Sequence, residues 1–315
     1  MEPSTKIIFS TLLVASCFPS SELKNPEAGE QETYTCPEGM ANIENKFCID
    51  RYEASIVDKS TRVFASPHYI PSQEGYHDAD WQYNIFSKMD INPKLLPELI
   101  KEGQPVDMPL RGAEQFVAFQ PLAVSVPDKI PATYVTKNTA EKACDNAGKR
   151  LCTREEWYQA CVGPEGAHPF LNENNQEIFP VAYPYGAQYE TGKCNAGLHN
   201  RWPPGVLGRK KTGEMKDPRI SRLLGKDGLP MKQKTNSFPG CVNGYSLYNM
   251  VGNVHEIVSD TRKAQQFPRE RVTYVGSHYA RESKDAHQGK ESCAEATVDH
   301  WESYTDYSLG FRCCK

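Results

Sequence analysis

The stretch 247-LYNMVGNVHEIVSD-260 combines two properties that conflict. Its apolar residues predict a buried segment, yet Asn249, Gly252, Asn253 and Glu256 interrupt the run. A buried amide or carboxylate costs free energy unless a partner bonds to it. The stretch therefore predicts that the interior supplies partners for Asn249 and Glu256, and those partners have to be identified.

The composition describes a soluble, loop-rich protein. The chain has 315 residues, of which 38% are hydrophobic and 24% are charged, with a formal net charge of −4. This length suits one large domain or two ordinary ones. The chain is weakly acidic, and its longest basic run is the short 209-RKK-211. This charge does not favour binding to nucleic acid or to an anionic membrane surface. We therefore expect no nucleic-acid partner.

The first residues predict export. Lys6 precedes an apolar run, Ile7–Ala15, that is too short to cross a bilayer and is typical of a signal peptide. Residues 14-VASC-17 resemble a bacterial lipobox, in which Cys17 would be lipidated, residues 1–16 removed, and residues 17–33 left as a flexible tether. The alternative is an ordinary cleavable signal peptide with Cys17 incidental. The small residues before Cys17 favour an exported bacterial lipoprotein, in the periplasm or on the outer membrane, which contacts membrane only through its lipid.

The cysteine count agrees with export. Eleven cysteines are present, and ten remain once Cys17 is set aside. An even number in an oxidising compartment predicts five disulfides, and no spacing resembles a zinc site. Cys313 and Cys314 are adjacent, so we expect each to bond to a different partner.

Local signals predict a few regular elements. Residues 36–57 read as a hairpin or short meander with its turn near 42–45. A helix is expected from the N-cap Thr136 to Gly148. A second helix should begin at Thr153, which stands in capping-box spacing with Glu156, and end at 163-GP-164. A short helix at 93–102 and a final strand in 307-YSLGFRCCK-315 are also expected.

Six landmarks occur along the chain in a fixed order. They are 48-CIDRYEAS-55, 148-GKRLCTREEWYQAC-161, 183-YPYG-186, 244-GYSLYNMVGNVHEIVSD-260, 274-YVGSHY-279 and 309-LGFRC-313. Together they resemble the sulfatase-modifying-factor, or formylglycine-generating-enzyme-like, family over residues 34–315, with insertions at about 60–130 and 201–236. The resemblance implies an α+β fold, a variant of the C-type lectin fold with little regular secondary structure. Disulfides and calcium stabilise the interior of that fold.

The resemblance also implies partners for the opening stretch. Calcium would be coordinated by the side chains of Asn249 and Glu256 and by the backbone carbonyls of Gly252 and Val254, a set of oxygen ligands that suits this ion. A second, weaker calcium site would begin at Asn195 and the carbonyl of Ala196. For the disulfides, the resemblance implies Cys144–Cys313 and Cys161–Cys293. Elimination and proximity then leave Cys152–Cys314, Cys194–Cys241 and Cys36–Cys48.

The family's reaction site is where this chain departs from the pattern. The family binds copper(I) through two cysteines after its GGS motif, and thiolates suit this soft ion. Here the family serine matches Ser277, the first cysteine matches Ala280 and the second matches Asp285, while His255 replaces a family tryptophan. We therefore expect no copper and no formylglycine generation. The weak catalytic candidates are His255, Ser277, His278, Asp285 and His287, whose alternative interpretation is a set of polar residues on an exposed loop.

Two classes of function remain open. One is a diverged oxidoreductase-type enzyme of the cell envelope. The other is a non-catalytic C-type-lectin-like module that binds a protein, peptide or glycan or has an envelope-structural role, with loops 60–130 (Tyr69, Tyr76, Trp81, Tyr83) and 201–236 as candidate surfaces. The cleft behind Ser277 discriminates between them. An open cleft favours the enzyme, and a cleft filled by an insertion favours binding or structure.

Overall fold

A computed structural model describes residues 34–68, 71, 119–197, 220–223, 229–262, 271–280 and 291–315. All of them belong to one compact unit, Tyr34–Lys315. The expected signal peptide, Cys17, the tether and the helix at 93–102 lie outside the described residues. The same holds for the candidate aromatics Tyr69, Tyr76, Trp81 and Tyr83. Within the described ranges, no helix is both long and apolar enough to cross a membrane.

Regular structure is sparse and the elements are short, as expected for an α+β chain rich in loops. Its elements are β1 (Met40–Ile43), β2 (Phe47–Asp50), β3 (Ser55–Asp58), β4 (Pro121–Val124), α3 (Lys137–Asn146), β5 (Arg150–Leu151), α4 (Arg154–Val162), β6 (Phe170–Leu171), β7 (Glu177–Ile178), the 3₁₀ turn η3 (Ile220–Arg222), β8 (His255–Arg262), β9 (Arg271–Val275), β10 (Ala296–His300), β11 (Leu309–Phe311) and β12 (Cys313–Cys314).

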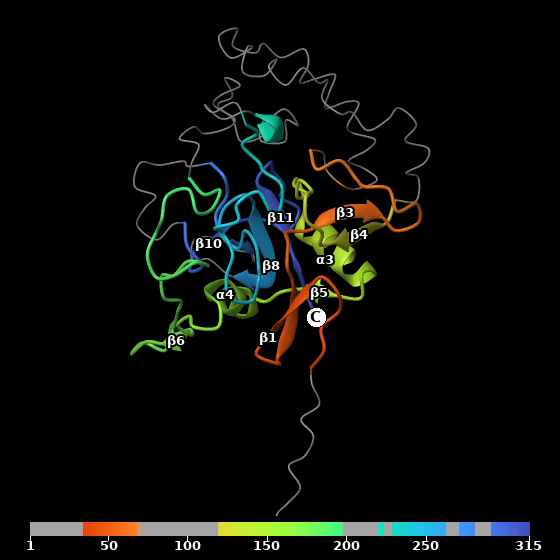
Figure 1. Cartoon of the computed structure of the whole chain (residues 1–315). Coiled ribbons are helices and arrows are strands. Elements are labelled where there is room, and N and C mark those ends of the chain that lie inside the picture. The colour runs from red at the N-terminus through yellow and green to blue at the C-terminus, as the bar shows by residue number, and fades with distance from the viewer. Residues whose placement is uncertain are drawn as a thin grey trace, which may run out of the picture. The chain divides into compact units, whose positions relative to one another are not determined.

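The first sheet joins the two ends of the described chain. Its strand order is β1-β2-β12-β5, so the last strand lies between the N-terminal hairpin and β5. Figure 1 marks the C-terminus beside β5. The hairpin forms where the sequence predicts it, with Glu44 and Asn45 in the left-handed turn conformation. Backbone hydrogen bonds between Cys48 and Lys315, one in each direction, fix β12 beside β2.

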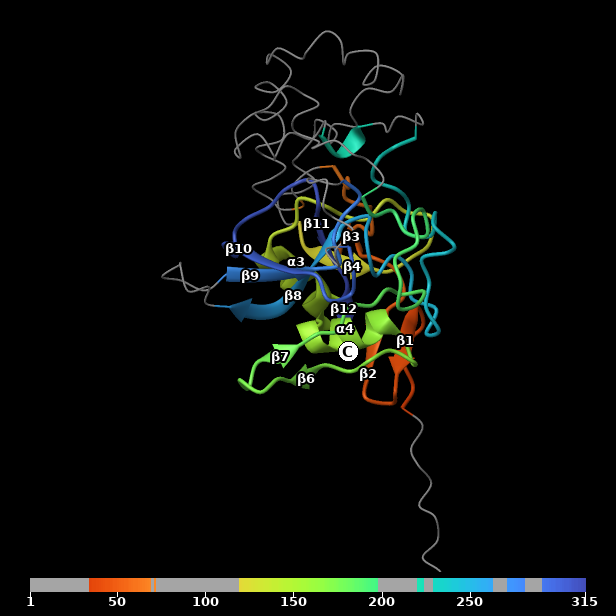
Figure 2. The ribbon, with the colours of Figure 1, turned by 90° about the vertical axis from the view of Figure 1, so that its left-hand side faces the viewer.

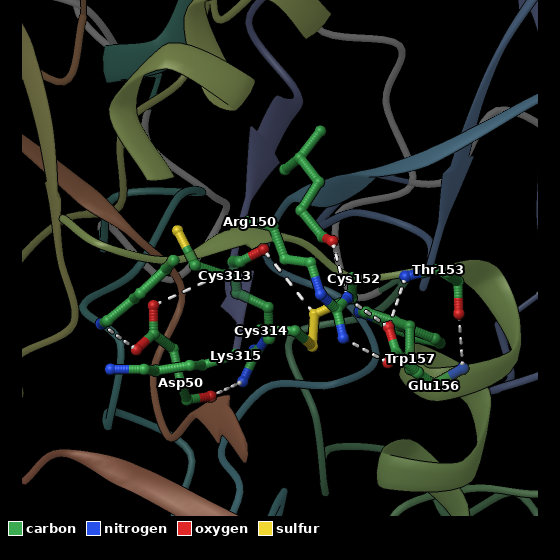
Figure 3. The surroundings of a disulfide bond; sticks show 12 residues. Asp50, Arg150, Cys152, Thr153, Glu156, Trp157, Cys313, Cys314 and Lys315 are labelled. Atoms are coloured by element: carbon green, nitrogen blue, oxygen red, sulfur yellow. Dashed lines mark hydrogen bonds and ion pairs between the residues drawn. A yellow bond between two sulfur atoms is a disulfide. The ribbon is translucent and has the colours of Figure 1, made fainter. Parts of the chain in front are cut away.

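Figure 3 shows how a disulfide anchors this C-terminal strand. Cys314 is bonded to Cys152, and the next residue, Thr153, begins α4. Thr153 accepts a hydrogen bond from the Glu156 backbone, and the Glu156 carboxylate accepts one from the Thr153 backbone, which is the predicted capping box. The other helix, α3, is capped by Thr136 as expected, and Gly148 follows its end in the left-handed conformation.

The second sheet carries the opening stretch of sequence. Its order is β10-β9-β8-β11, with β8 antiparallel to β9 and parallel to β11. Helix α3 packs against β4, β5 and β8, and α4 packs against β8 (Figure 1). Two apolar clusters result, one around Trp157, Tyr158 and Val258, and the other around Val135, Ile257 and Phe311.

Five disulfides stabilise the core. They join Cys36 to Cys48, Cys144 to Cys313, Cys152 to Cys314, Cys161 to Cys293 and Cys194 to Cys241. These are the five pairs expected from the sequence, and the adjacent Cys313 and Cys314 do bond to different partners. Cross-links of this kind each contribute typically about 2–4 kcal/mol, mainly by restricting the unfolded chain.

Two structural features refine the sequence-based expectations. The end of the stretch treated as an insertion, 121–124, forms β4 and pairs with β3, so it belongs to the domain's own framework. A short hairpin, β6–β7, occurs within 163–246, where the sequence has no periodicity. Figure 2 shows this hairpin at the edge of the domain. Its turn contains Asn175 in the left-handed conformation.

Candidate functional site

The polar residues of the opening stretch converge on two charged groups from distant landmarks. The Glu256 carboxylate accepts hydrogen bonds from Nε and Nη2 of Arg312, both at 2.7 Å, and from Trp157 Nε1 at 2.6 Å. Arg312 is fully buried, and its Nη1 also donates to the Asp50 carbonyl at 3.0 Å. Glu256 therefore has a protein cation as its partner.

A second buried carboxylate, Glu53, bonds to the amides of the stretch. Its oxygens accept hydrogen bonds from Asn249 Nδ2 and Asn253 Nδ2, all at 3.0 Å. Burial, together with the nearby negative charge of Glu256, raises the pKa of Glu53 to about 8. Glu53, Asn249, Asn253, Glu256 and Arg312 form what we call the Glu–Arg cluster.

Sequence reasoning did not single out Glu53 or Arg312, although both lie inside quoted landmarks, 48-CIDRYEAS-55 and 309-LGFRC-313. An available signal was that each landmark places a charged residue among apolar ones. Charged residues in such surroundings are almost never fully buried unless they are paired. The pairing of Glu256 with Arg312 spans 56 residues of sequence and has no local pattern.

The expected calcium ligands fit in part. The side-chain oxygens of Asn249 and Asn195 are buried and have no hydrogen-bond partner among the described residues, as is suitable for an oxygen ligand. Gly252 approaches the Asn195 carbonyl so closely that a Cβ there would lie 2.4 Å from that oxygen. Glu256, in contrast, is already neutralised by Arg312, so its burial does not require an ion. Within the described ranges, no group of three or more His, Cys, Asp or Glu side chains is arranged to hold a metal.

The segment 276–280, which we call the cleft segment, follows β9 and contains Ser277. Gly276 and Ser277 both have positive φ, at 84° and 62°. A Cβ on Gly276 would lie 2.8 Å from both the Met250 carbonyl oxygen and the Trp157 ring, so only glycine fits. This turn directs the chain back over the opening stretch, where the Gly252 amide donates to the Gly276 carbonyl at 2.6 Å.

The structure brings together two of the five catalytic candidates, His255 and His278, whose ring centroids are 4.9 Å apart. A third, Ser277, precedes His278 in the chain and is buried. Burial, reinforced by His255, lowers the pKa of His278 well below its usual value, so this imidazole is neutral at pH 7. The remaining two candidates, Asp285 and His287, lie outside the described residues.

The position of the first family cysteine is covered. Ala280 is buried and belongs to an apolar cluster whose other members are Tyr134, Ile220, Leu223, Met231, Tyr279 and Tyr307. Ile220, Leu223 and Met231, which we call the plug, come from the second insertion. All ten cysteines from Cys36 to Cys314 are in disulfides, so none of them offers a thiol to replace the missing one.

The two insertions meet behind this plug. His68 Nδ1 and Ser221 Oγ are hydrogen-bonded at 2.7 Å, and the buried Lys232 donates to the Pro67 carbonyl at 2.8 Å. Lys232 also donates to Thr133 Oγ1 at 2.6 Å, and burial lowers its pKa well below the usual value. Polar bonds between both insertions therefore hold the plug in place.

The fold and this site together define a class of protein. The class is an α+β domain with short elements, which disulfides cross-link around a buried glutamate–arginine pair. A family model described as "Sulfatase-modifying factor enzyme 1-like domain" matches residues 27–315. The chain belongs to this family, and the fold class expected from the sequence, the formylglycine-generating-enzyme-like variant of the C-type lectin fold, is confirmed.

Individual relatives are more distant. The chain is similar to the formylglycine-generating enzymes of Mus musculus and Bos taurus, each 29% identical over 195 residues, which cover 58% of this chain and 43% of the relative. The matched region thus spans less than half the length of those curated relatives. A solved structure, "Major Tropism Determinant P3c Variant", aligns with a TM-score of 0.40 at 10% identity over 89% of this chain and 52% of its own. The structure of CarF aligns with a TM-score of 0.29 at 16% identity, over 85% of this chain and 85% of its own. These low scores add nothing to the family match.

Proposed function

We propose that this chain is a non-catalytic member of its family that acts as a binding module of the bacterial cell envelope. One observation carries the proposal. Ala280, at the position of the first family cysteine, is buried under the plug from the second insertion. The plug packs on Ala280, at the position where the resemblance places the first thiol, and a neutral, buried His278 is a poor proton donor to a substrate. The diverged oxidoreductase hypothesis is correspondingly disfavoured.

The test is direct. The purified protein is incubated with copper(I), oxygen and a cysteine-containing peptide, and mass spectrometry follows conversion of the thiol to an aldehyde. Metal analysis of the same preparation measures bound copper and iron. We expect no conversion and no stoichiometric transition metal. Conversion of the peptide, or one equivalent of copper or iron per chain, would contradict the proposal.

Export and lipidation at Cys17 are part of the same proposal. Five disulfides suit a chain that folds in an oxidising compartment, and the lipobox-like residues precede a polar tether. Expression in a bacterium followed by membrane fractionation tests this. We expect the protein in the membrane fraction and its Cys17→Ala variant outside that fraction. Equal distribution of the two forms would exclude the anchor.

Structural calcium at Asn249 and Asn195 is also proposed, because their buried side-chain oxygens have no hydrogen-bond partner in the described part of the chain. Those two amide oxygens would coordinate the ion. Glu256→Gln is a poor test, since it also breaks the ion pair with Arg312. Thermal melts in EGTA, calcium and magnesium are better. Only calcium should raise the melting temperature. At a calcium concentration a hundred times the dissociation constant, the free energy of unfolding should increase by about 2.7 kcal/mol. Identical melts would exclude the ion.

A further inference from the structure

A cavity of about 730 Å³ lies away from the cleft segment. Three loops line it, residues 162–167, 181–187 and 242–244. This volume is within the usual range for ligand pockets, roughly 300–1,000 Å³. Neither the cleft segment nor the Glu–Arg cluster contributes to its walls. The cavity is therefore separate from the site that the proposal on catalysis concerns.

The cavity has a rigid wall, because each loop is tied to a disulfide. Val162 follows Cys161, and Val242 follows Cys241. The loop 181–187 is attached through the Ala182 carbonyl, which accepts a hydrogen bond from the Cys293 amide at 2.8 Å. Cys293 is itself the partner of Cys161. Walls that are fixed before binding reduce the entropy lost when a partner docks.

A side-chain amide and close backbone packing complete this wall. Asn243 Nδ2 donates to the carbonyls of Ala160 and Cys161 at 2.6 and 3.1 Å, which joins the first and third loops. A Cβ on Gly244 would lie 2.8 Å from the Pro164 ring, so these loops pack as closely as glycine permits. The cavity is therefore a built feature of the fold.

The chemistry of the surface is apolar and acidic. The parallel rings of Tyr183 and Tyr185 line the cavity with small apolar residues, and burial raises the pKa of Tyr185 to about 12, so its phenol stays protonated. Val181 at the rim is 55% exposed. On the neighbouring hairpin, Phe170 and Leu171 are 55% and 61% exposed. Exposed apolar side chains of this size, close in the chain to the loops that line a cavity, indicate a contact surface.

The segment between the first two loops is acidic, although two cations lie over rings beside it, Lys193 at 5.9 Å from the Tyr185 ring and Arg154 at 3.9 Å from the Phe179 ring. Residues 163–192 contain Glu165, Glu173, Glu177 and Glu190, all exposed, and no lysine or arginine. Glu190 is paired with Lys193, which follows the segment, at 3.4 Å. This charge disfavours anionic ligands and favours a basic partner. The apolar rim favours a polypeptide over a saccharide, because a polypeptide can insert apolar side chains.

We propose that the cavity and the β6–β7 hairpin form a docking surface for a polypeptide segment that combines basic side chains with an apolar anchor. The anchor fills the cavity beside Tyr185, and the basic side chains face Glu165 and the hairpin glutamates. Tyrosine is among the residue types that contribute most to binding energy at protein interfaces. This inference rests on the proposed binding role and names the class of partner.

The test uses two fluorescent synthetic peptides and the purified protein. One peptide is built from lysine, arginine, proline and leucine, and its twin carries glutamate at every basic position. Fluorescence anisotropy should detect binding of the basic peptide only. Val181→Asp should weaken binding at least about tenfold. Val63→Asp, the same change at a valine that is 57% exposed outside this surface, should leave binding unchanged.

Charge variants separate docking from simple attraction. The double change Glu173→Lys and Glu177→Lys should weaken binding, whereas Glu38→Lys should not. No binding of the basic peptide, or equal binding of both peptides, would overturn the inference. So would loss of binding in the charge variants with no effect of Val181→Asp, since the cavity would then take no part. A glycan array that reported a saccharide dependent on Val181 would overturn the polypeptide assignment. None of these results bears on catalysis, because the copper assay tests that proposal separately.

Discussion

The Glu–Arg cluster and the cleft segment lie next to each other in the fold but differ in what they keep of the family. The cluster contains the landmark residues Glu53, Glu256 and Arg312, each with a bonded partner. The cleft segment contains Ala280 where the resemblance places a family cysteine, and the plug packs on it. The comparison teaches that the residues which identify the family here maintain its structure. That the residues for its chemistry have changed is part of the proposal above.

The largest expected effect comes from breaking the buried ion pair. Arg312→Met leaves Glu256 as an uncompensated buried charge, and such changes cost about 3–5 kcal/mol. The matched control is Arg150→Met, because Arg150 pairs with Glu156 at 2.6 Å with 47% of its side chain exposed. The control should cost about 0–1 kcal/mol. Urea denaturation measures both, and similar values for the two variants would mean that the cluster does not organise the core.

The plug offers the next test. Leu223 is 1% exposed, so Leu223→Ala should destabilise the protein by about 2–5 kcal/mol. Leu229, in the same insertion but 57% exposed, should tolerate the same change within about 0.5 kcal/mol. If Leu223→Ala were neutral by denaturation, the plug would not pack over Ala280, and the cleft would have to be treated as open.

The third prediction concerns pH. The folded pKa of Glu53 is raised from 4.5 to about 8, so the unfolded chain releases this proton first as the pH rises. Stability should therefore be full below about pH 4 and should decline toward pH 8. Between pH 5 and 7 the decline should be about 2–3 kcal/mol at about 1.4 kcal/mol per unit. Glu53→Gln should remove this slope in EGTA, and Glu38→Gln should keep it. A slope unchanged in Glu53→Gln would assign it to another group.

The smallest effect is expected where the framework joins the first insertion. Burial raises the pKa of Asp58, but hydrogen bonds from Ser60, Thr61 and Gln120 outweigh it and hold the pKa at about 2. The lowered pKa adds stability above pH 4 that is lost as the pH falls toward 2. Asp58→Asn should cost about 1–2 kcal/mol at pH 7 and little at pH 2. An equal cost at both values would rule out the charge as the cause.

Local chemistry explains what the sequence could predict. The caps at Thr136 and Thr153 depend on neighbouring residues. Two disulfide pairs were implied by the family resemblance, and elimination and proximity then left the other three. The hairpin β6–β7 was missed because strands of two residues have no alternating pattern. The plug was missed because the few apolar residues around Ile220 and Leu223 show no periodic pattern in a polar loop. Only the folded chain brings them to Ala280.

For the candidate site, the sequence predicted the buried polar residues but only some of their partners. Asn249 and Glu256 were recognised as buried polar groups, and a calcium ion was the partner expected for both. For Glu256 the structure supplies Arg312 from the C-terminal landmark, which no spacing rule could indicate. For Asn249 the oxygen still lacks a partner in the described chain. Calcium stays a prediction for both residues.

The placement of the C-terminal residues has a consequence for the order of events during synthesis. Residues 309–314 supply two strands, the buried arginine and two disulfide partners. Strand β12 lies between strands made at the start and middle of the domain. A nascent chain that has not yet released these residues from the ribosome lacks the centre of its first sheet and the counter-charge for Glu256. The first sheet and the buried ion pair can therefore form only once residues 309–314 are available, and Cys144 and Cys152 lack their partners until then.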